Sequence, residues 1–286
     1  MAGRCSRRTS VAVMSTTPAA LAGVTPGSAA ALVDGLVDEL AGADDVVGSV
    51  HAHRARRRGP HAAAVGPLVV PVSRLEGVLD ALDADPRSEP LDLVLVADSG
   101  LVEAAEARAV LLDDDRVALL GLHVALPLDG HPSDSARLVL DTLDFALPAW
   151  VAVPLVPGWE GALDVLGEDG AERALLLTGT DPGDRALAEF VVGCARRGLA
   201  FSVAGGAWSG SRAVALLAAA GAALDARDTG HVLSLLEDAD DAQRLAVLAD
   251  ADAVAVRRLL VSIGTDHVVP VLDGLEALGL LEPDAA

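Results

Sequence analysis

The sequence contains no lysine, no asparagine and no tyrosine, and its single glutamine is Gln243. A Schiff-base aldolase, a pyridoxal-phosphate enzyme and a P-loop nucleotide binder each need a lysine amine at the centre of the site. The missing amine therefore excludes these three classes in their usual forms. We predict that borohydride traps no carbonyl compound on any side chain, so that mass mapping finds a reduced adduct at the amino terminus alone. An internal adduct would refute this prediction.

Aromatic residues and cysteines are also scarce. Aromatics make up 2% of the 286 residues although 52% are hydrophobic, so the core has to consist of Val, Leu and Ala. Such a composition suits parallel strands that are buried on both faces. The two cysteines, Cys5 and Cys194, are too few for a disulfide framework, which predicts a reducing, cytoplasmic environment with Cys194 as a small core residue. No window approaches the roughly eighteen uninterrupted apolar residues of a membrane helix, so no membrane partner is predicted.

Positive charge is in the minority. The chain has 21 Lys plus Arg against 42 Asp plus Glu, which gives a formal net charge of −21. A protein of this charge repels nucleic-acid phosphates, so nucleic acid is not an expected partner. The densest positive segment, residues 54–58, is interpreted as the solvated end of a helix, where cations complement the helix dipole.

The amino-terminal segment is expected to lie outside the folded domain. Residues 1–27 are predicted to form a disordered tail, and residues 28–286 a single domain. Arg7 and Arg8, with the apolar stretch that follows, resemble a twin-arginine export signal, but residues 15–18 interrupt that stretch. Export is therefore the weaker alternative, and Met14 is a second candidate for the start of translation.

From about residue 28 onward, short apolar runs alternate with amphipathic segments. The apolar runs predict strands at Ala62–Val72, Leu91–Ala97, Val117–Leu126, Trp150–Pro154, Ala174–Leu177, Leu199–Ala204 and Leu259–Ile263. Regular alternation with helices implies right-handed crossovers and parallel strands that are neighbours in that order. We predict an α/β fold with one (β/α)₈ barrel of the TIM type, and an open doubly wound sheet is the alternative.

The first barrel strand is the uncertain element of this prediction. It would have to lie near Leu32–Leu40, where the local pattern favours a helix, so a barrel with a degenerate first strand is an alternative to the complete barrel. Extra helices are predicted between Leu224 and the last strand, at Thr229–Glu237, Asp240–Leu248 and Ala251–Arg258.

One pair of adjacent strand ends combines glycine, hydroxyl groups and positive charge. The predicted anion-binding residues there are Gly205, Gly206, Ser209, Ser211, Arg212, Gly264 and Thr265. Glycines allow close backbone approach to a phosphate or carboxylate, hydroxyls cap the helix and donate, and arginine adds charge. A small anionic metabolite is therefore the predicted ligand. Loss of Arg212 is expected to weaken the binding of this ligand with little effect on the stability of the fold. Ordinary turn chemistry is the alternative explanation for the glycine pair and for Ser211.

Acid–base side chains at the other strand ends are few and scattered. The candidates for general acid and base are His123, Asp98, Asp266 and His267. Together with His131 they could also act as ligands of a divalent metal. Their spacing is not diagnostic of a metal site, so neither a metal nor another cofactor is predicted. The segment around Ser209 lacks both the Gly-x-Ser-x-Gly elbow of hydrolases and the Rossmann glycine pattern.

Residues 57–61, 69–75, 201–212 and 257–264 resemble segments of an uncharacterised group of barrel-like proteins from high-GC bacteria. Members of that group carry Lys and Arg before a Thr-Gly-Gly, a second Lys, a His pair and two acidic residues at their strand ends. At the matching positions this chain keeps Thr178, Gly179, Gly206 and Arg212, but has Leu175, Leu177, Thr180, Ser202, Trp208, Ser209, His123 and Ala152 instead of the other residues. The resemblance implies a divergent member that has lost the Lys, Arg and His residues of a charged site.

Two functions from different classes follow from these observations. The favoured one is a non-catalytic or degenerate paralogue that retains an anion-binding mouth at the strand ends. The alternative is a barrel enzyme of the lyase or isomerase type, without a Schiff base, acting on a small phosphorylated or carboxylic metabolite. An open pocket in which Arg212, His123 and Asp266 converge would favour the enzyme, and a mouth filled by Trp208 and leucines would favour the paralogue.

Overall fold

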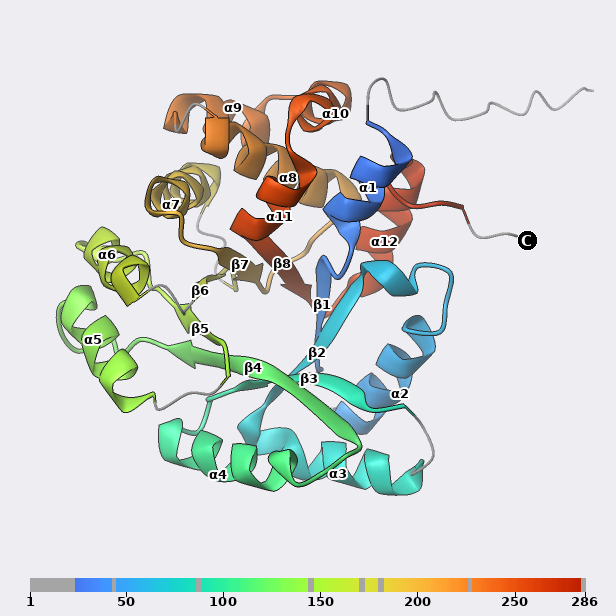
Figure 1. Cartoon of the computed structure of the whole chain (residues 1–286), viewed down its shortest axis with the longest axis vertical. Helices are drawn as coiled ribbons and strands as arrows, with labels where there is room; N and C mark the ends of the chain where they lie inside the picture. The colour runs from blue at the N-terminus through green and yellow to red at the C-terminus, as the bar shows by residue number, and fades with distance from the viewer. Residues whose placement is uncertain are drawn as a thin grey trace, which may run out of the picture.

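A computed structural model describes residues 24–42, 45–85, 89–143, 147–169, 173–179, 183–225 and 228–283. Its parallel strands close into one barrel in which β1 to β8 are neighbours in chain order (Figure 1). The strands are β1 (Val37–Leu40), β2 (Val65–Pro71), β3 (Leu91–Val96), β4 (Val117–Ala125), β5 (Ala149–Ala152), β6 (Arg173–Leu177), β7 (Phe201–Ala204) and β8 (Leu260–Thr265). The predicted (β/α)₈ barrel and the order of its strands are confirmed.

Helices surround the barrel (Figure 1). They are α1 (Pro26–Val33), α2 (Val46–Arg56), α3 (Leu75–Ala84), α4 (Leu101–Leu112), α5 (Pro132–Thr142), α6 (Trp159–Asp169), α7 (Gly183–Arg197), α8 (Gly210–Asp225), α9 (Thr229–Glu237), α10 (Asp241–Asp250), α11 (Ala253–Leu259) and α12 (Val268–Ala277). The extra helices predicted before the last strand are α9, α10 and α11. In the described part of the chain, no helix has the length and apolar character needed to cross a membrane.

The first strand is short, but it pairs on both sides and so closes the barrel. β1 pairs in parallel with β2 on one side and with β8 on the other, where Val37 faces Ile263. The local pattern that favoured a helix over Leu32–Leu40 is wrong for most of that range: α1 begins at Pro26, where the side chain of Thr25 caps it, and ends at Val33, and residues 37–40 form β1. The described chain is therefore helical from Pro26, whereas the predicted tail extended to residue 27, and residues 1–23 of that tail lie outside the described residues.

Two hydrophobic clusters fill the molecule. The larger one lies between the outward faces of the strands and the helices, and it includes Cys194, which is buried as predicted. The smaller one lies inside the barrel and contains Val69, Val94, Trp150, Ala152, Leu175 and Ala204. Side chains on a strand alternate between its faces, so β2, β3, β5, β6 and β7 each contribute buried residues to both clusters.

The arginine-rich end of α2 is not simply solvated, which corrects the interpretation of residues 54–58. Arg54 is buried. Arg56 forms an ion pair with Glu39, a buried residue of β1, and Arg57 donates to the carbonyl of Val65 at 2.8 Å. These arginines attach α2 to the barrel, so much of the segment has a structural role.

Candidate functional site

The loop between β7 and α8 borders a small pocket at the barrel mouth, the end of the barrel where the strands finish. This β7–α8 pocket has a volume of about 250 Å³ and is lined by Thr178, Asp184, Leu187, Gly206, Ala207, Trp208 and Arg212. Gly205 and Gly206 have φ angles of 89° and 76°, which residues with a side chain rarely adopt. Glycine is therefore required at both positions for the chain to turn beside the pocket.

The fold itself fixes the geometry of this loop. The carbonyl of Gly205 accepts hydrogen bonds from the Thr178 hydroxyl at 2.5 Å and from the Trp208 indole N–H at 2.6 Å. The backbone N–H of Gly205 donates to the carbonyl of Gly264 at 2.9 Å. The loop is thereby tied to the ends of β6 and β8 and does not depend on a ligand for its shape.

Arg212 projects from the first turn of α8 into contact with neighbouring helices. Its Nη2 pairs with the carboxylate of Asp184 at the start of α7, and its Nη1 donates to the carbonyl of Leu236 in α9 at 3.3 Å. An anion in the β7–α8 pocket would have to share the guanidinium with Asp184. Arg212 also links α7, α8 and α9, so its loss would remove contacts between these helices as well as charge from the pocket.

The two predicted serines have different roles. Ser209 accepts a hydrogen bond from the backbone N–H of Arg212 at 3.2 Å and so caps α8 beside the pocket. Ser211 instead donates to Asp241 of α10 at 2.6 Å. Ser209 therefore stays with the candidate anion site, whereas Ser211 joins two helices.

Gly264 and Thr265 do not line the pocket. Gly264 contributes the carbonyl that Gly205 uses, and Thr265 is fully buried, with its hydroxyl accepting from the N–H of His267 at 3.0 Å. Of the predicted anion-binding residues, Gly206 and Arg212 line the pocket, and Gly205 and Ser209 lie beside it in the same loop. Asp184, which balances the arginine, was missed, because the docking of α7 against α8 leaves no signal in the sequence.

The four candidate acid–base residues are dispersed. Asp98 accepts from the Ser73 hydroxyl at 2.5 Å; partial burial tends to raise the pKa of Asp98, but the hydrogen bonds from Ser73 lower it overall. Asp266 and His267 are mostly exposed beyond β8 and lie 3.8 Å apart, and His123 is buried in β4. Among the described residues, Asp266 and His267, which are neighbours in sequence, are the only two of these four candidates that contact each other.

Metal-ligand side chains do not gather in the described ranges either. There, no three His, Cys, Asp or Glu residues are placed so that they could hold one metal ion. His131, the further candidate ligand, instead has its Nδ1 at 2.9 Å from the hydroxyl of Ser133.

A polar cluster that the sequence analysis did not identify lies inside the barrel, near the amino-terminal ends of the strands. Asp38 accepts a hydrogen bond from Ser262 at 2.5 Å, and the hydroxyls of Ser262 and Ser202 lie 2.9 Å apart. Ser202 accepts from the indole N–H of Trp150 at 3.0 Å, and the Arg173 guanidinium lies 4.7 Å from the Trp150 ring centroid. These polar groups therefore bind one another across the barrel.

Burial controls the titration of two interior groups. It raises the pKa of Asp38 to about 7, although the hydrogen bond from Ser262 and the charge of Arg257 act in the opposite direction. Burial lowers the pKa of His123 to about 4. The Nε2 atom of His123 is buried without a hydrogen-bond partner, and its ring packs edge-on against Trp150 with centroids 5.5 Å apart. At neutral pH, His123 is thus an uncharged core residue.

Toward the barrel mouth, the inward-facing positions become apolar. Because side chains alternate along a strand, residues two positions beyond the polar cluster also point inward. These residues are Leu40, Ala152, Leu175, Ala204 and Gly264. A pocket of about 600 Å³ at the ends of β4, β5 and β6 is lined by Ala, Val, Leu and Pro side chains alone. Arg212, His123 and Asp266 do not converge there.

No protein-family model and no curated protein matches this chain. The fold defines a (β/α)₈ barrel, a class that supports many unrelated functions, so function has to be argued from the site.

Proposed function

We propose that this protein is a non-catalytic (β/α)₈ barrel, a degenerate relative of the barrel group it resembles, and that it binds a small anion in the β7–α8 pocket. The observation that carries the proposal is the distribution of polar groups inside the barrel. Barrel enzymes place their catalytic side chains at the carboxyl-terminal ends of the strands. Here the polar cluster around Asp38 and Trp150 lies at the amino-terminal ends, whereas the inward-facing side chains toward the mouth and the pocket at the ends of β4, β5 and β6 are apolar.

Three features of the β7–α8 pocket support an anionic ligand. Gly206 has no side chain to cover the backbone, Arg212 supplies charge, and the pocket lies beside the first turn of α8. The positive end of a helix dipole favours negative groups. Phosphate and carboxylate share this chemistry, so both are candidate head groups. Asp184 opposes binding because it occupies part of the same guanidinium.

Calorimetric titration with inorganic phosphate and with small dicarboxylates tests the anion site. We expect Arg212→Gln to weaken binding about ten- to a hundredfold, since a charge-assisted hydrogen bond contributes about 1.5 to 3 kcal/mol. Asp184→Asn is expected to strengthen binding, because it releases Arg212 for the ligand. The matched control is Arg185→Gln on the same helix as Asp184, where the arginine is 77% exposed and pairs with Glu189.

Equal affinities in the wild type, Arg212→Gln and Asp184→Asn would contradict the anion site. Urea denaturation of each variant separates a lost contact from a lost fold, because Arg212 also joins three helices. Any metabolite that binds is expected to be recovered unchanged. Turnover that disappears in Asp98→Asn or Asp266→Asn would instead establish the alternative, a barrel enzyme.

A further inference from the structure

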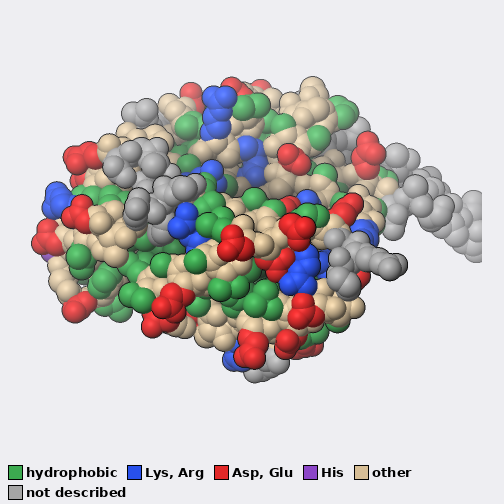
Figure 2. Space-filling view, turned by 60° about the horizontal axis from the view of Figure 1, so that its bottom comes forward, with side chains coloured by type: hydrophobic (Ala, Val, Ile, Leu, Met, Phe, Trp, Pro, Cys, Tyr) green, Lys and Arg blue, Asp and Glu red, His purple; other side chains and the backbone are tan. Residues whose placement is uncertain are grey.

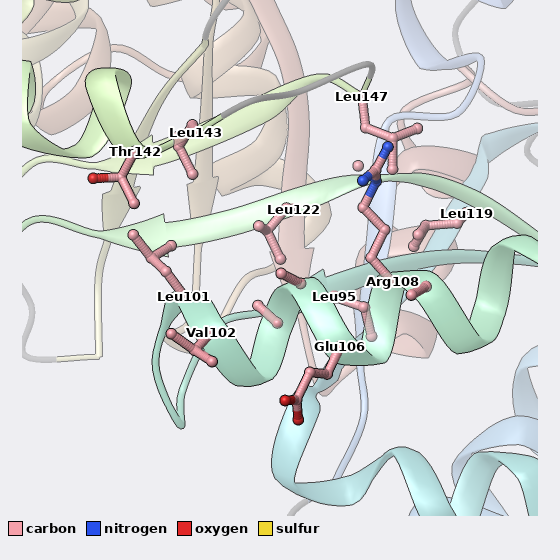
Figure 3. Close-up of a pocket in the computed structure, with 14 residues that line it drawn as sticks. Leu95, Leu101, Val102, Glu106, Arg108, Leu119, Leu122, Thr142, Leu143 and Leu147 are labelled. Carbon is pink, nitrogen blue, oxygen red and sulfur yellow. The ribbon is translucent and has the colours of Figure 1, made fainter.

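A groove on the outside of the barrel runs between α4 and the end of α5 (Figure 3). Its volume is about 570 Å³, and its lining is mainly apolar. Leu95, Leu119 and Leu122 of β3 and β4 form the floor, and Leu101 and Leu143 are among the walls. Small-molecule sites commonly have this size and an apolar lining with a few polar groups.

Arg108 is the cation of this groove. Its side chain extends from α4 across β4 toward Leu147, whereas Glu106 points away from the groove (Figure 3). The Nε atom of Arg108 is buried, and none of the residues that the structure describes provides it with a hydrogen-bond partner. Within the described part of the chain, Arg108 forms no ion pair with a carboxylate. A donor left without a partner in apolar surroundings is unfavourable, and an anionic group in the groove would satisfy it.

The apolar surface continues beyond the groove. Val102, Val110 and Leu112 of α4 are 68%, 54% and 56% exposed, and Leu120 of β4 is 40% exposed. Figure 2 turns the α3 and α4 side of the molecule toward the viewer and shows apolar side chains between scattered acidic ones. Exposed apolar side chains next to an apolar groove commonly mark a binding site.

We propose that the groove binds an amphipathic monoanion of the fatty-acid class. Its hydrocarbon chain lies along Leu101, Leu122 and Leu143, and its carboxylate binds Arg108. Charge complementarity selects this ligand: a purely apolar occupant would leave Arg108 without a partner, and an inorganic anion would leave Val102 and the partly buried Leu101 and Leu143 in contact with water. The groove is separate from the β7–α8 pocket, so this inference does not depend on the proposed function.

Calorimetric titration with decanoate, decanol and decyltrimethylammonium, each below its aggregation concentration, tests the head group. We expect decanoate to bind at least ten times more tightly than decanol, and the cation not to bind. From octanoate to dodecanoate, affinity is expected to rise about fourfold for each added methylene, as the burial of apolar surface requires. Equal binding of decanoate and decanol would overturn the proposal, and so would an affinity that does not depend on chain length.

Two variants locate the site. Arg108→Gln is expected to lower the affinity for decanoate about ten- to a hundredfold while leaving the affinity for decanol unchanged. Ala109→Trp fills the groove from its exposed side and is expected to abolish binding of both. Arg137→Gln, on α5 outside the groove, removes an arginine that is 60% exposed and is expected to change neither affinity.

The proposal fails if Arg108→Gln binds decanoate as tightly as the wild type. Sedimentation equilibrium with and without decanoate checks the other occupant of an apolar face, a second copy of this chain. A dimer that decanoate dissociates and that Ala109→Trp prevents from forming would overturn the proposal, because the groove would then be an interface between subunits. A monomer in both conditions supports the ligand site.

Discussion

Replacing Asp38 with Asn is expected to stabilise the protein by several kcal/mol above pH 7. Burial raises the pKa of Asp38 to about 7 in the native state, whereas an aspartate in the unfolded chain titrates near pH 4. Between these values the native state holds a proton that the unfolded state has released, so the contribution of Asp38 to stability falls as pH rises and levels off above pH 7. The full loss is about 4 kcal/mol, and the neutral Asn side chain avoids it.

Urea denaturation between pH 4 and pH 8 measures this effect. The difference in the free energy of unfolding between Asp38→Asn and the wild type should be small at pH 4 and should grow until about pH 7. Asp92→Asn is the matched control, because Asp92 also lies on a barrel strand but its side chain is 34% exposed and pairs with Arg57. A difference for Asp38→Asn that does not change with pH would show that Asp38 titrates as an ordinary carboxylate.

His123 should show the opposite pH dependence. Burial lowers its pKa from 6.5 to about 4, so the contribution of the neutral ring is present above pH 6.5 and is lost as pH falls toward 4. His123→Phe should therefore gain stability relative to the wild type as pH falls through this window. In net terms, folding near pH 5 removes a proton from His123 and adds one to Asp38.

Gly210→Ala is expected to destabilise the protein by about 3 kcal/mol or more, because the substitution overpacks a contact between two backbones. Gly210 begins α8 and lies directly against Gly274 in α12. A Cβ atom added at Gly210 would lie 2.2 Å from the carbonyl carbon of Gly274 and 2.6 Å from the nitrogen of Leu275. Backbone atoms cannot rotate away as a side chain can, so the two helices would have to separate.

Gly221→Ala on the same helix is the control for this substitution. A Cβ atom there would meet Ala251 at 3.4 Å and Val256 at 3.5 Å, which are ordinary contacts. Alanine also favours a helix interior over glycine by up to about 1 kcal/mol, so this variant is expected to be as stable as the wild type or more stable. Urea denaturation of both variants at one pH provides the comparison. A similar loss in both would mean that the contact between α8 and α12 is not specific.

The fold could be predicted because its signal is local. Runs such as Leu91–Val96 are nearly continuous in apolar residues, as strands covered on both faces must be. β1 gave the weakest signal because two of its four residues, Asp38 and Glu39, are acidic. These two side chains can be buried because they have polar partners. Asp38 accepts a hydrogen bond from Ser262, which is 224 residues away in sequence, and Glu39 pairs with Arg56 in the following helix. No local pattern contains that information.

The candidate site was predicted less well, because the partners of its side chains depend on how the helices pack against one another. The glycines beside the β7–α8 pocket and the cap at Ser209 follow from local sequence. The partners of Ser211 and Arg212 are Asp241 and Asp184, and those contacts exist only once α10 and α7 pack against α8. The sequence also does not show that Arg108 lacks a partner among the described residues, because an arginine in a helix ordinarily reaches water.

Closure of the barrel by β1 and β8 has a consequence for biosynthesis. The strand that closes the barrel against β1 is the last of the eight to be synthesised, since Leu260–Thr265 follows the other seven strands in the chain. Until then the edge of β1 is unpaired, and an unpaired strand edge can bind another chain. Contacts this distant in sequence also form slowly. The nascent chain therefore has an exposed strand edge from the synthesis of β1 until that of β8, and chaperones protect such edges from aggregation.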